Sequence, residues 1–164
     1  MNWLNWPWSR PKLVRDYYRP EWVEIGAAEL GQRLLSALNL FHPGTAWNVQ
    51  WTPMDGRYRC TSRADFNILV GADWGTKKAY LIDFYDCDNF AFAFKAYIDS
   101  YGLNSVGIVY DYSAHPPGSD EITPHAYNIV LFDDGAVIAF EPQTDTFANL
   151  GWGLYTLTNG VIII

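Results

Sequence analysis

Cysteine and histidine are scarce in this chain of 164 residues. The only cysteines are Cys60 and Cys87, and the three histidines stand singly along the sequence. One bridge would not make the disulfide framework typical of small secreted proteins, so we expect reduced cysteines and a cytoplasmic rather than a secreted location. Zinc sites need clustered cysteine and histidine ligands, and the sequence has no such cluster.

Long apolar runs are missing as well. No stretch approaches the roughly 20 apolar residues that a membrane-spanning helix requires. The N-terminus lacks the charged and apolar regions of a signal peptide. We therefore expect neither a membrane span nor an export signal.

Positive charge is in short supply. The chain has 11 Lys and Arg against 18 Asp and Glu, which gives a net charge of −7. A surface of this sign repels phosphate backbones, so nucleic acid is excluded as the main partner. The nearest approach to a basic cluster is Arg57, Arg59 and Arg63, which we interpret as a solvated face.

Apolar and aromatic residues are plentiful, at 49% and 17% of the chain. That content suits one domain with a packed core. Residues 1–19 are rich in Trp, Pro and Arg, and their prolines resist helix formation, so we predict an aromatic N-terminal arm there. Residues 20–164 are expected to form a single domain without repeats or a linker.

The apolar pattern predicts an α+β fold. Helical spacing favours one helix roughly over residues 20–40 and a second over 89–98, with Gly102 as a cap. A tight turn at 133–135 joins two of the expected strands. The predicted strands are 47–51, 105–110, 126–132, 136–140, 153–157 and 160–164. Residues 66–70 and 79–84 fit either strands or helical turns.

Cys87 stands where a loop enters the second predicted helix. Unpaired backbone N–H groups and the positive end of the helix dipole stabilise a thiolate at that position. The neighbouring Asp86 and Asp88 oppose this effect, since their charges raise the thiol pKa. An imidazolium partner would therefore be needed for activation, and a buried structural cysteine is the alternative interpretation.

His125 opens one predicted strand and Glu141 closes the next. With a turn centred near Asp134, antiparallel pairing places Glu141 opposite a residue near Ala126, one position from His125. A carboxylate there would orient the imidazole ring and favour its charged form. The alternative for Glu141 is a solvated strand end.

This order of a cysteine at a helix start, a histidine opening a strand and an acidic residue ending the next strand resembles that of papain-like cysteine peptidases. Three segments carry the likeness most closely, and they resemble the cysteine-protease domain of the Marasmius oreades agglutinin and its relatives. They are Asp-Cys-Asp-Asn-Phe-Ala at 86–91, His-Ala-Tyr-Asn at 125–128 and Phe-Glu-Pro-Gln at 140–143. The resemblance spans about residues 80–145.

The resemblance implies a papain-like fold, in which the helix bearing the nucleophile packs on an antiparallel sheet or half-barrel. It also implies a cysteine hydrolase or peptidase that cleaves an amide bond of a peptide-like substrate through a thioester acyl-enzyme. Cys87 would be the nucleophile, His125 the base and Glu141 the orienting residue. CHAP-type amidases and NlpC-type peptidases share the residue order, so the substrate stays open.

An oxyanion hole would combine the backbone N–H of Cys87 with a glutamine side chain. Papain-like peptidases place that glutamine upstream of the cysteine, but residues 78–86 contain none. Gln143 is the preferred substitute, and Gln50 is the other candidate.

The resemblance further implies a calcium requirement, although the chemistry itself needs no cofactor. Asp83, Asp86 and Asp88 could supply oxygen ligands to Ca²⁺. A second possible set is Asp111, Asp120 and Glu121. Solvated carboxylates on an acidic protein are the alternative to both sets.

Two other functions remain open from the sequence. The missing upstream glutamine and the many tryptophans favour a catalytically degenerate papain-like protein that binds a ligand. A structural or assembly protein, viral or prophage-borne, would use the aromatic arm as a docking segment.

Overall fold

The computed structural model describes residues 18–44, 46–72, 79–81 and 84–164. The predicted arm over 1–19 therefore lies outside the described residues except for its last two positions. Of these, Tyr18 donates a hydrogen bond from its hydroxyl to Asp65 and packs against the core. Asp65 belongs to the helix α3 (Arg63–Gly71), whose N-cap Ser62 accepts a hydrogen bond from the Asp65 N–H at 3.1 Å.

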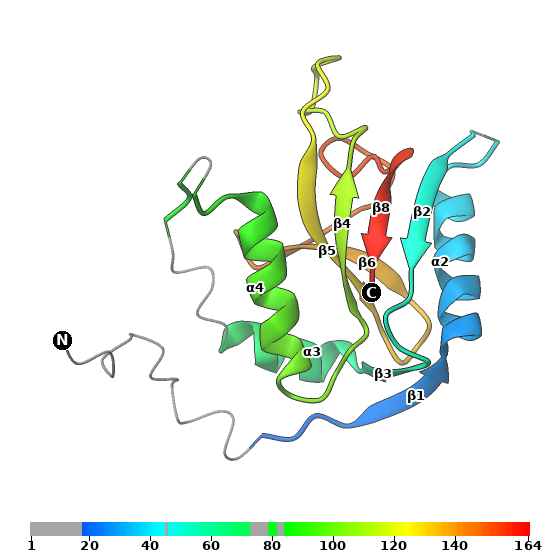
Figure 1. The fold of residues 1–164 in the computed structure, drawn as a ribbon, viewed down its shortest axis with the longest axis vertical. Coiled ribbons are helices and arrows are strands. Elements are labelled where there is room, and N and C mark those ends of the chain that lie inside the picture. The colour runs from blue at the N-terminus through cyan, green and yellow to red at the C-terminus, as the bar shows by residue number, and fades with distance from the viewer. Residues whose placement is uncertain (1–17, 45, 73–78, 82–83) are drawn as a thin grey trace.

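A six-stranded sheet forms the centre of the molecule, in the order β2-β8-β4-β5-β6-β7 (Figure 1). Neighbouring strands are antiparallel except for β2 and β8, which pair in parallel, so the expected antiparallel sheet is mixed at one edge. The strands are β2 (Asn48–Thr52), β4 (Val106–Asp111), β5 (His125–Leu131), β6 (Val137–Glu141), β7 (Thr146–Ala148) and β8 (Asn159–Ile163).

The helix predicted over 20–40 is wrong in its first part. Residues Trp22–Gly26 form a strand, β1, which pairs antiparallel with β3 (Arg57–Thr61) in a separate two-stranded sheet. Aromatic and β-branched residues favour a strand here, and pairing with a distant segment decides the outcome. The helix α2 (Ala27–Phe41) then begins after Gly26 and buries Leu30, Leu34 and Leu38.

Helices cover both faces of the large sheet (Figure 1). The leucines of α2 pack on one face, against alternate residues such as Tyr127 and Ala139. On the other face, α3 and the helix α4 (Cys87–Asp99) pack against the intervening residues, and Phe94 stacks on Phe140 with ring centroids 4.5 Å apart. The predicted helix over 89–98 is thus confirmed, with its start two residues earlier.

Other segments differ from the sequence prediction. The ambiguous residues 66–70 belong to helix α3, and the described part of 79–84 forms only an isolated bridge between Leu81 and Tyr85. The strand predicted over 153–157 is a turn, and the short strand β7 was not predicted. β7 forms a hairpin with β6, and an isolated bridge joins Trp152 to Tyr155 around the turn.

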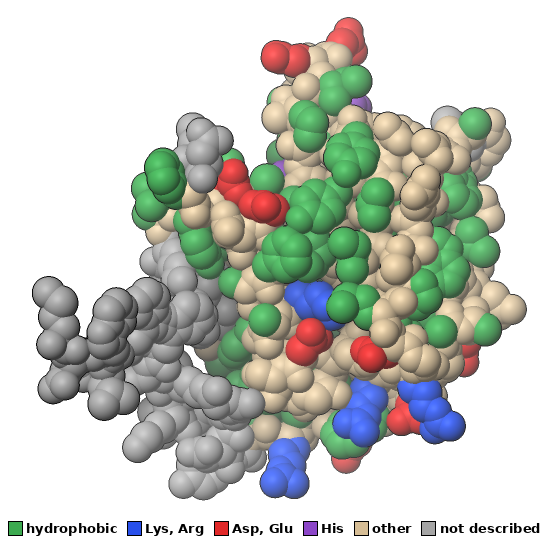
Figure 2. All heavy atoms as spheres, in the orientation of Figure 1, with side chains coloured by type: hydrophobic (Ala, Val, Ile, Leu, Met, Phe, Trp, Pro, Cys, Tyr) green, Lys and Arg blue, Asp and Glu red, His purple; other side chains and the backbone are tan. Residues whose placement is uncertain are grey.

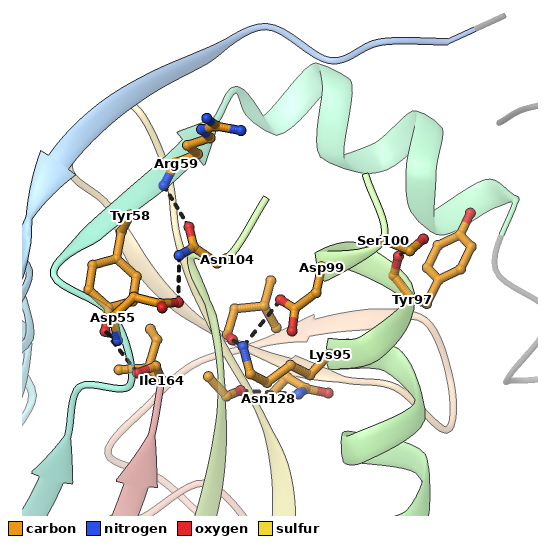
Figure 3. A network of polar contacts seen from close by, with 12 residues as sticks. Asp55, Tyr58, Arg59, Lys95, Tyr97, Asp99, Ser100, Asn104, Asn128 and Ile164 are labelled. Atoms are coloured by element: carbon orange, nitrogen blue, oxygen red, sulfur yellow. Dashed lines mark hydrogen bonds and ion pairs between the residues drawn. The ribbon is translucent and has the colours of Figure 1, made fainter. Parts of the chain in front are cut away.

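A polar network anchors the C-terminal end of α4 (Figure 3). Lys95 donates hydrogen bonds to Asp99 and to the Val106 carbonyl at 3.2 and 2.9 Å. Nearby, the Asn104 side chain accepts from the Arg59 N–H and donates to Asp55. Because these contacts fix one end of α4 against β4, its other end, which carries Cys87, is held at the opposite end of the sheet.

Both cysteines are free thiols: Cys60 is buried in β3 and Cys87 is partly exposed. None of the helices in the described ranges is both long enough and apolar enough to cross a lipid bilayer.

Candidate functional site

His125 and Glu141 lie on the same face of the sheet. Asn128 pairs with Phe140, which carries Glu141 to the level of Tyr127, two residues from His125. Side chains two positions apart on a strand share a face. The His125 Nε2 and Glu141 Oε2 atoms are 2.7 Å apart. The predicted register, with Glu141 opposite Ala126, was one residue off and would have put the two side chains on opposite faces.

Cys87 reaches this pair from the first residue of α4. The buried side chain of Asn128 donates hydrogen bonds to the carbonyls of Ala91 in α4 and Gly107 in β4, at 3.0 and 3.1 Å. This attachment holds the start of α4 against β5, and the Cys87 thiol is a hydrogen-bond partner of the His125 ring. The structure therefore brings together Cys87, His125 and Glu141, as the sequence predicted.

His125 carries a positive charge at neutral pH. Its side chain is only 12% exposed, and that burial lowers its pKa. The hydrogen bonds and electrostatic interactions of the ring with Cys87 and Glu141 outweigh burial and raise the pKa of His125 to about 9. The result is a largely enclosed imidazolium held between a carboxylate and a sulfur atom.

Cys87, His125 and Glu141 form a cluster with a fourth residue, Tyr155, which the sequence did not predict. Its hydroxyl donates to Glu141 Oε2 at 3.1 Å, and its ring meets that of His125 edge-on. Burial and the Glu141 carboxylate raise the pKa of Tyr155, so its hydroxyl stays protonated as a donor. No local pattern marked this tyrosine, because the turn that carries it is placed by long-range packing.

Asp111 fixes the loops beside the cluster. It is completely buried, and its Oδ1 accepts from the N–H and hydroxyl of Ser113 at 2.9 and 2.7 Å. Its Oδ2 accepts from the Leu157 N–H at 2.7 Å. Both oxygens thus tie the 112–124 loop to the turn that contains Tyr155, which leaves Asp111 unsuited to the cation-ligand role considered for it.

The described residues do not form the calcium site predicted from Asp83, Asp86 and Asp88. Asp83 lies outside the described residues. The Asp88 carboxyl hydrogen-bonds to Asp86, which raises the Asp88 pKa. Across the described ranges, no group of three or more His, Cys, Asp or Glu side chains is arranged to hold a metal ion.

The predicted oxyanion-hole residues are only partly at the cluster. As the first residue of α4, Cys87 has a backbone N–H without an intrahelical acceptor. The backbone N–H of Gln143 donates to Glu141 Oε1 at 3.1 Å, so this residue supports the carboxylate. Gln50 lies on β2, which β8 and β4 separate from β5, so it is remote from the cluster.

Large apolar side chains are exposed on the segments that surround the cluster. Trp152 is 67% exposed in the turn of Tyr155, and Tyr112 is 48% exposed next to Asp111. Figure 2 shows apolar side chains gathered over the upper part of this face and most basic side chains at its lower end. Exposed apolar residues of four segments are grouped under the name aromatic rim, although two of them are aliphatic: the segment before α4, α4 itself, the 112–124 loop and the turn of Tyr155. They are Tyr80, Leu81, Phe84, Phe92, Tyr112, Ile122 and Trp152.

The sequence model of the ricin-type beta-trefoil lectin C-terminal domain matches residues 67–157, more than half of the chain. The chain belongs to this family. The match contains Cys87, His125, Glu141, Tyr155 and all of the aromatic rim. No curated protein sequence matches the chain.

Two solved structures share the fold of this family member. The "PSL1a-E64 complex" superposes with a TM-score of 0.64 at 21% identity, and covers 84% of this chain and 51% of its own. Polyporus squamosus lectin bound to the human-type influenza-binding epitope Neu5Aca2-6Galb1-4GlcNAc gives a TM-score of 0.62 at 20% identity, with 84% and 49% covered. The chain thus spans about half the length of these structures.

These matches correct the expected identity. The resemblance to papain-like cysteine peptidases is overturned by the lectin family match, and the structural neighbours are lectins. An enzyme that cleaves a peptide-like amide through a thioester at Cys87 is therefore the wrong conclusion. The proximity of Cys87, His125 and Glu141 stands on the structure, but the thioester mechanism assigned to them rested on the overturned resemblance. The ligand-binding alternative fits the matches better.

Proposed function

We propose that the chain is a carbohydrate-binding domain of a lectin, and that the aromatic rim receives the saccharide. Membership of the lectin C-terminal domain family carries this proposal, since the matched residues include the whole rim. The sugar epitope bound to Polyporus squamosus lectin belongs to that protein, and it supplies a first ligand to test here.

The rim has the chemistry that a sugar requires. Tryptophan and tyrosine rings offer an apolar face for the C–H groups of a sugar ring, and a polar edge for its hydroxyl groups. Exposed apolar side chains that gather in one region of a soluble domain mark an interaction site. Trp152 and Tyr112 lie on two such segments, and a backbone hydrogen bond of 3.1 Å from His115 to Gly153 joins those segments.

The buried cluster supports the rim from below. Glu141 binds both His125 and Tyr155, so it connects β5 and β6 to the turn that presents Trp152. A charged imidazole fixed by two partners stiffens this connection while it stays largely enclosed. The cluster then serves to position the rim for a ligand.

Calorimetric titration tests the proposal with Neu5Acα2-6Galβ1-4GlcNAc and with the neutral disaccharide Galβ1-4GlcNAc. Trp152→Ala should weaken binding about threefold to tenfold, because one aromatic contact contributes roughly 0.5–1.5 kcal/mol. Trp22→Ala is the matched control, since Trp22 is 47% exposed on β1, outside the rim. Absence of binding to both sugars at millimolar concentration, or equal effects of the two substitutions, would contradict the proposal.

A further inference from the structure

A cleft of about 690 Å³ lies between α2 and the edge of the sheet. None of the cluster or rim residues lines it. Its walls come from one side of α2, from the start of β6 and from the residues that follow β7. They are Glu29, Gln32, Arg33, Ser36, Ala37, Leu40, Phe41, Arg63, Gly135, Ala136, Val137, Ile138, Ala148, Asn149 and Leu150.

The cleft exposes an unpaired part of the edge of β6. Strand β7 ends at Ala148, opposite Ala139, so within the described chain no strand pairs with the outer side of Val137 and Ile138. Val137 belongs to the core on the α2 face and Ile138 packs on the opposite face. Since both residues line the cleft, the cleft runs along the strand edge and not over one face of the sheet.

The backbone of Val137 points toward this opening. The Phe132 N–H donates to the Ala136 carbonyl at 2.9 Å, so Ala136 directs its carbonyl toward β5. Backbone groups alternate sides along an antiparallel strand. The N–H and carbonyl of Val137 therefore face away from β5, where an added strand would pair with them.

The side chains across the cleft leave room for such a strand. Small residues face it from both sides, namely Ser36 and Ala37 on α2 and Ala136 and Ala148 on the sheet. The free edge covers Val137 and Ile138, which corresponds to about 7 Å of extended chain.

The two ends of the cleft differ in charge. Phe41 and Leu150 close one end, while Arg33 and Arg63 lie at the other. Arg33 is held by Glu29 at 2.7 Å and by the Phe132 carbonyl at 3.0 Å. Arg63 makes a longer contact of 3.6 Å with Asp134, and both side chains are half-exposed. Such an exposed pair is weak. The Arg63 guanidinium also lies over the Phe132 ring, 5.2 Å from its centroid, and from this position it can exchange Asp134 for another carboxylate.

We propose that this cleft binds an extended segment of a protein partner, which continues the line of β7 along β6 and places an acidic side chain beside Arg63. Main-chain hydrogen bonds to a free sheet edge provide the affinity in this mode of recognition. This surface is independent of the proposed sugar site.

The probe is the synthetic peptide acetyl-Thr-Val-Thr-Val-Glu-amide, titrated into the 15N-labelled full chain and followed by amide chemical shifts. Shifts should centre on Val137 and Ala148. A peptide N-methylated at alternate residues should lose binding, because it can no longer donate to the edge. Replacing its Glu by Gln, or Arg63→Ala in the protein, should each weaken binding about twofold to fivefold.

Arg57→Ala is the matched control, since Arg57 is an exposed arginine of β3 that pairs with Glu24 outside the cleft. Its titration should match that of the unmodified chain. Equal binding of the N-methylated peptide, shifts confined to other regions, or no shifts at 5 mM peptide would overturn the proposal. It would also be overturned if the neutral disaccharide, and not the peptide, shifted Val137.

Discussion

Glu141 and His125 sit diagonally across the β5–β6 ladder and are joined by a 2.7 Å contact on one face of the sheet. The same Glu141 oxygen accepts from Tyr155, and its other oxygen accepts from the Gln143 N–H. One carboxylate therefore connects two strands and two turns. The predictions below follow from this arrangement and from the loop contacts of Asp111.

Removing the Glu141 charge should lower the pKa of His125. Glu141→Gln keeps the shape of the side chain but removes the negative charge that, with Cys87, raises the His125 pKa to about 9. We expect a fall of about one unit or more, measured from the His125 ring signals in an NMR pH titration. Glu24→Gln, at an exposed pair with Arg57, should leave the titration unchanged. An unshifted His125 in the Glu141 variant would contradict the electrostatic account.

The raised pKa of His125 also predicts how stability depends on pH. The folded value of about 9 exceeds the ordinary value of 6.5, so the charged ring stabilises the native state below pH 6.5. That contribution is lost as pH rises through 9 and amounts to at most about 3 kcal/mol. Urea unfolding should show that the unsubstituted protein loses more stability between pH 6 and pH 9.5 than the His125→Asn variant does. Equal losses in the two chains would show that His125 is not the titrating group.

The two thiols should differ in reactivity. Cys60 is fully buried, and burial raises its pKa, whereas Cys87 is partly exposed at the start of α4. Limited iodoacetamide treatment at pH 7.5 should therefore label Cys87 at least tenfold faster, as measured by peptide mass spectrometry. His125→Asn should slow the labelling of Cys87 and leave Cys60 unaffected. Preferential labelling of Cys60 in the folded chain would contradict this assignment.

Local sequence was sufficient for the elements that carry the cluster. Phe90, Phe94 and Ile98 repeat at helical spacing, and the structure buries all three in α4. The strands on either side of Asp134 were equally clear. The turn at 133–135 was predicted, and Gly135 takes the positive φ of 89° that such a turn needs. The register drawn from it was one residue off, because a turn centred on Asp134 pairs Leu131 with Val137 and so brings Glu141 level with Tyr127.

Long-range pairing was beyond the reach of these local signals. The strand β1 exists because it pairs with β3, which lies more than thirty residues later. Tyr155 and Asp111 contribute to the site through hydrogen bonds between a strand and a turn that are far apart in sequence, and no sequence spacing predicted these contacts. The short motifs around Cys87 and His125 predicted which residues come together. Such motifs do not by themselves determine the function of the site.

Asp111 provides the last prediction, because one buried carboxylate holds the two loops beside the cluster. Its Oδ2 accepts from the Leu157 N–H at 2.7 Å, and Leu157 has a positive φ of 47°, which a residue with a side chain rarely adopts. Asp111→Asn cannot serve all the donors around it, because a carboxamide offers only one oxygen. The amide nitrogen would face either the Ser113 donors or the Leu157 N–H.

We expect Asp111→Asn to lower the free energy of unfolding by about 1–3 kcal/mol, measured by urea denaturation. The same substitution at the exposed loop residue Asp120 should change stability by less than about 0.5 kcal/mol. If the Asp111 variant also weakens binding of the sugar to the rim while it remains folded, the loops act as one unit with the cluster. Unchanged stability would mean that the loops are held by other contacts.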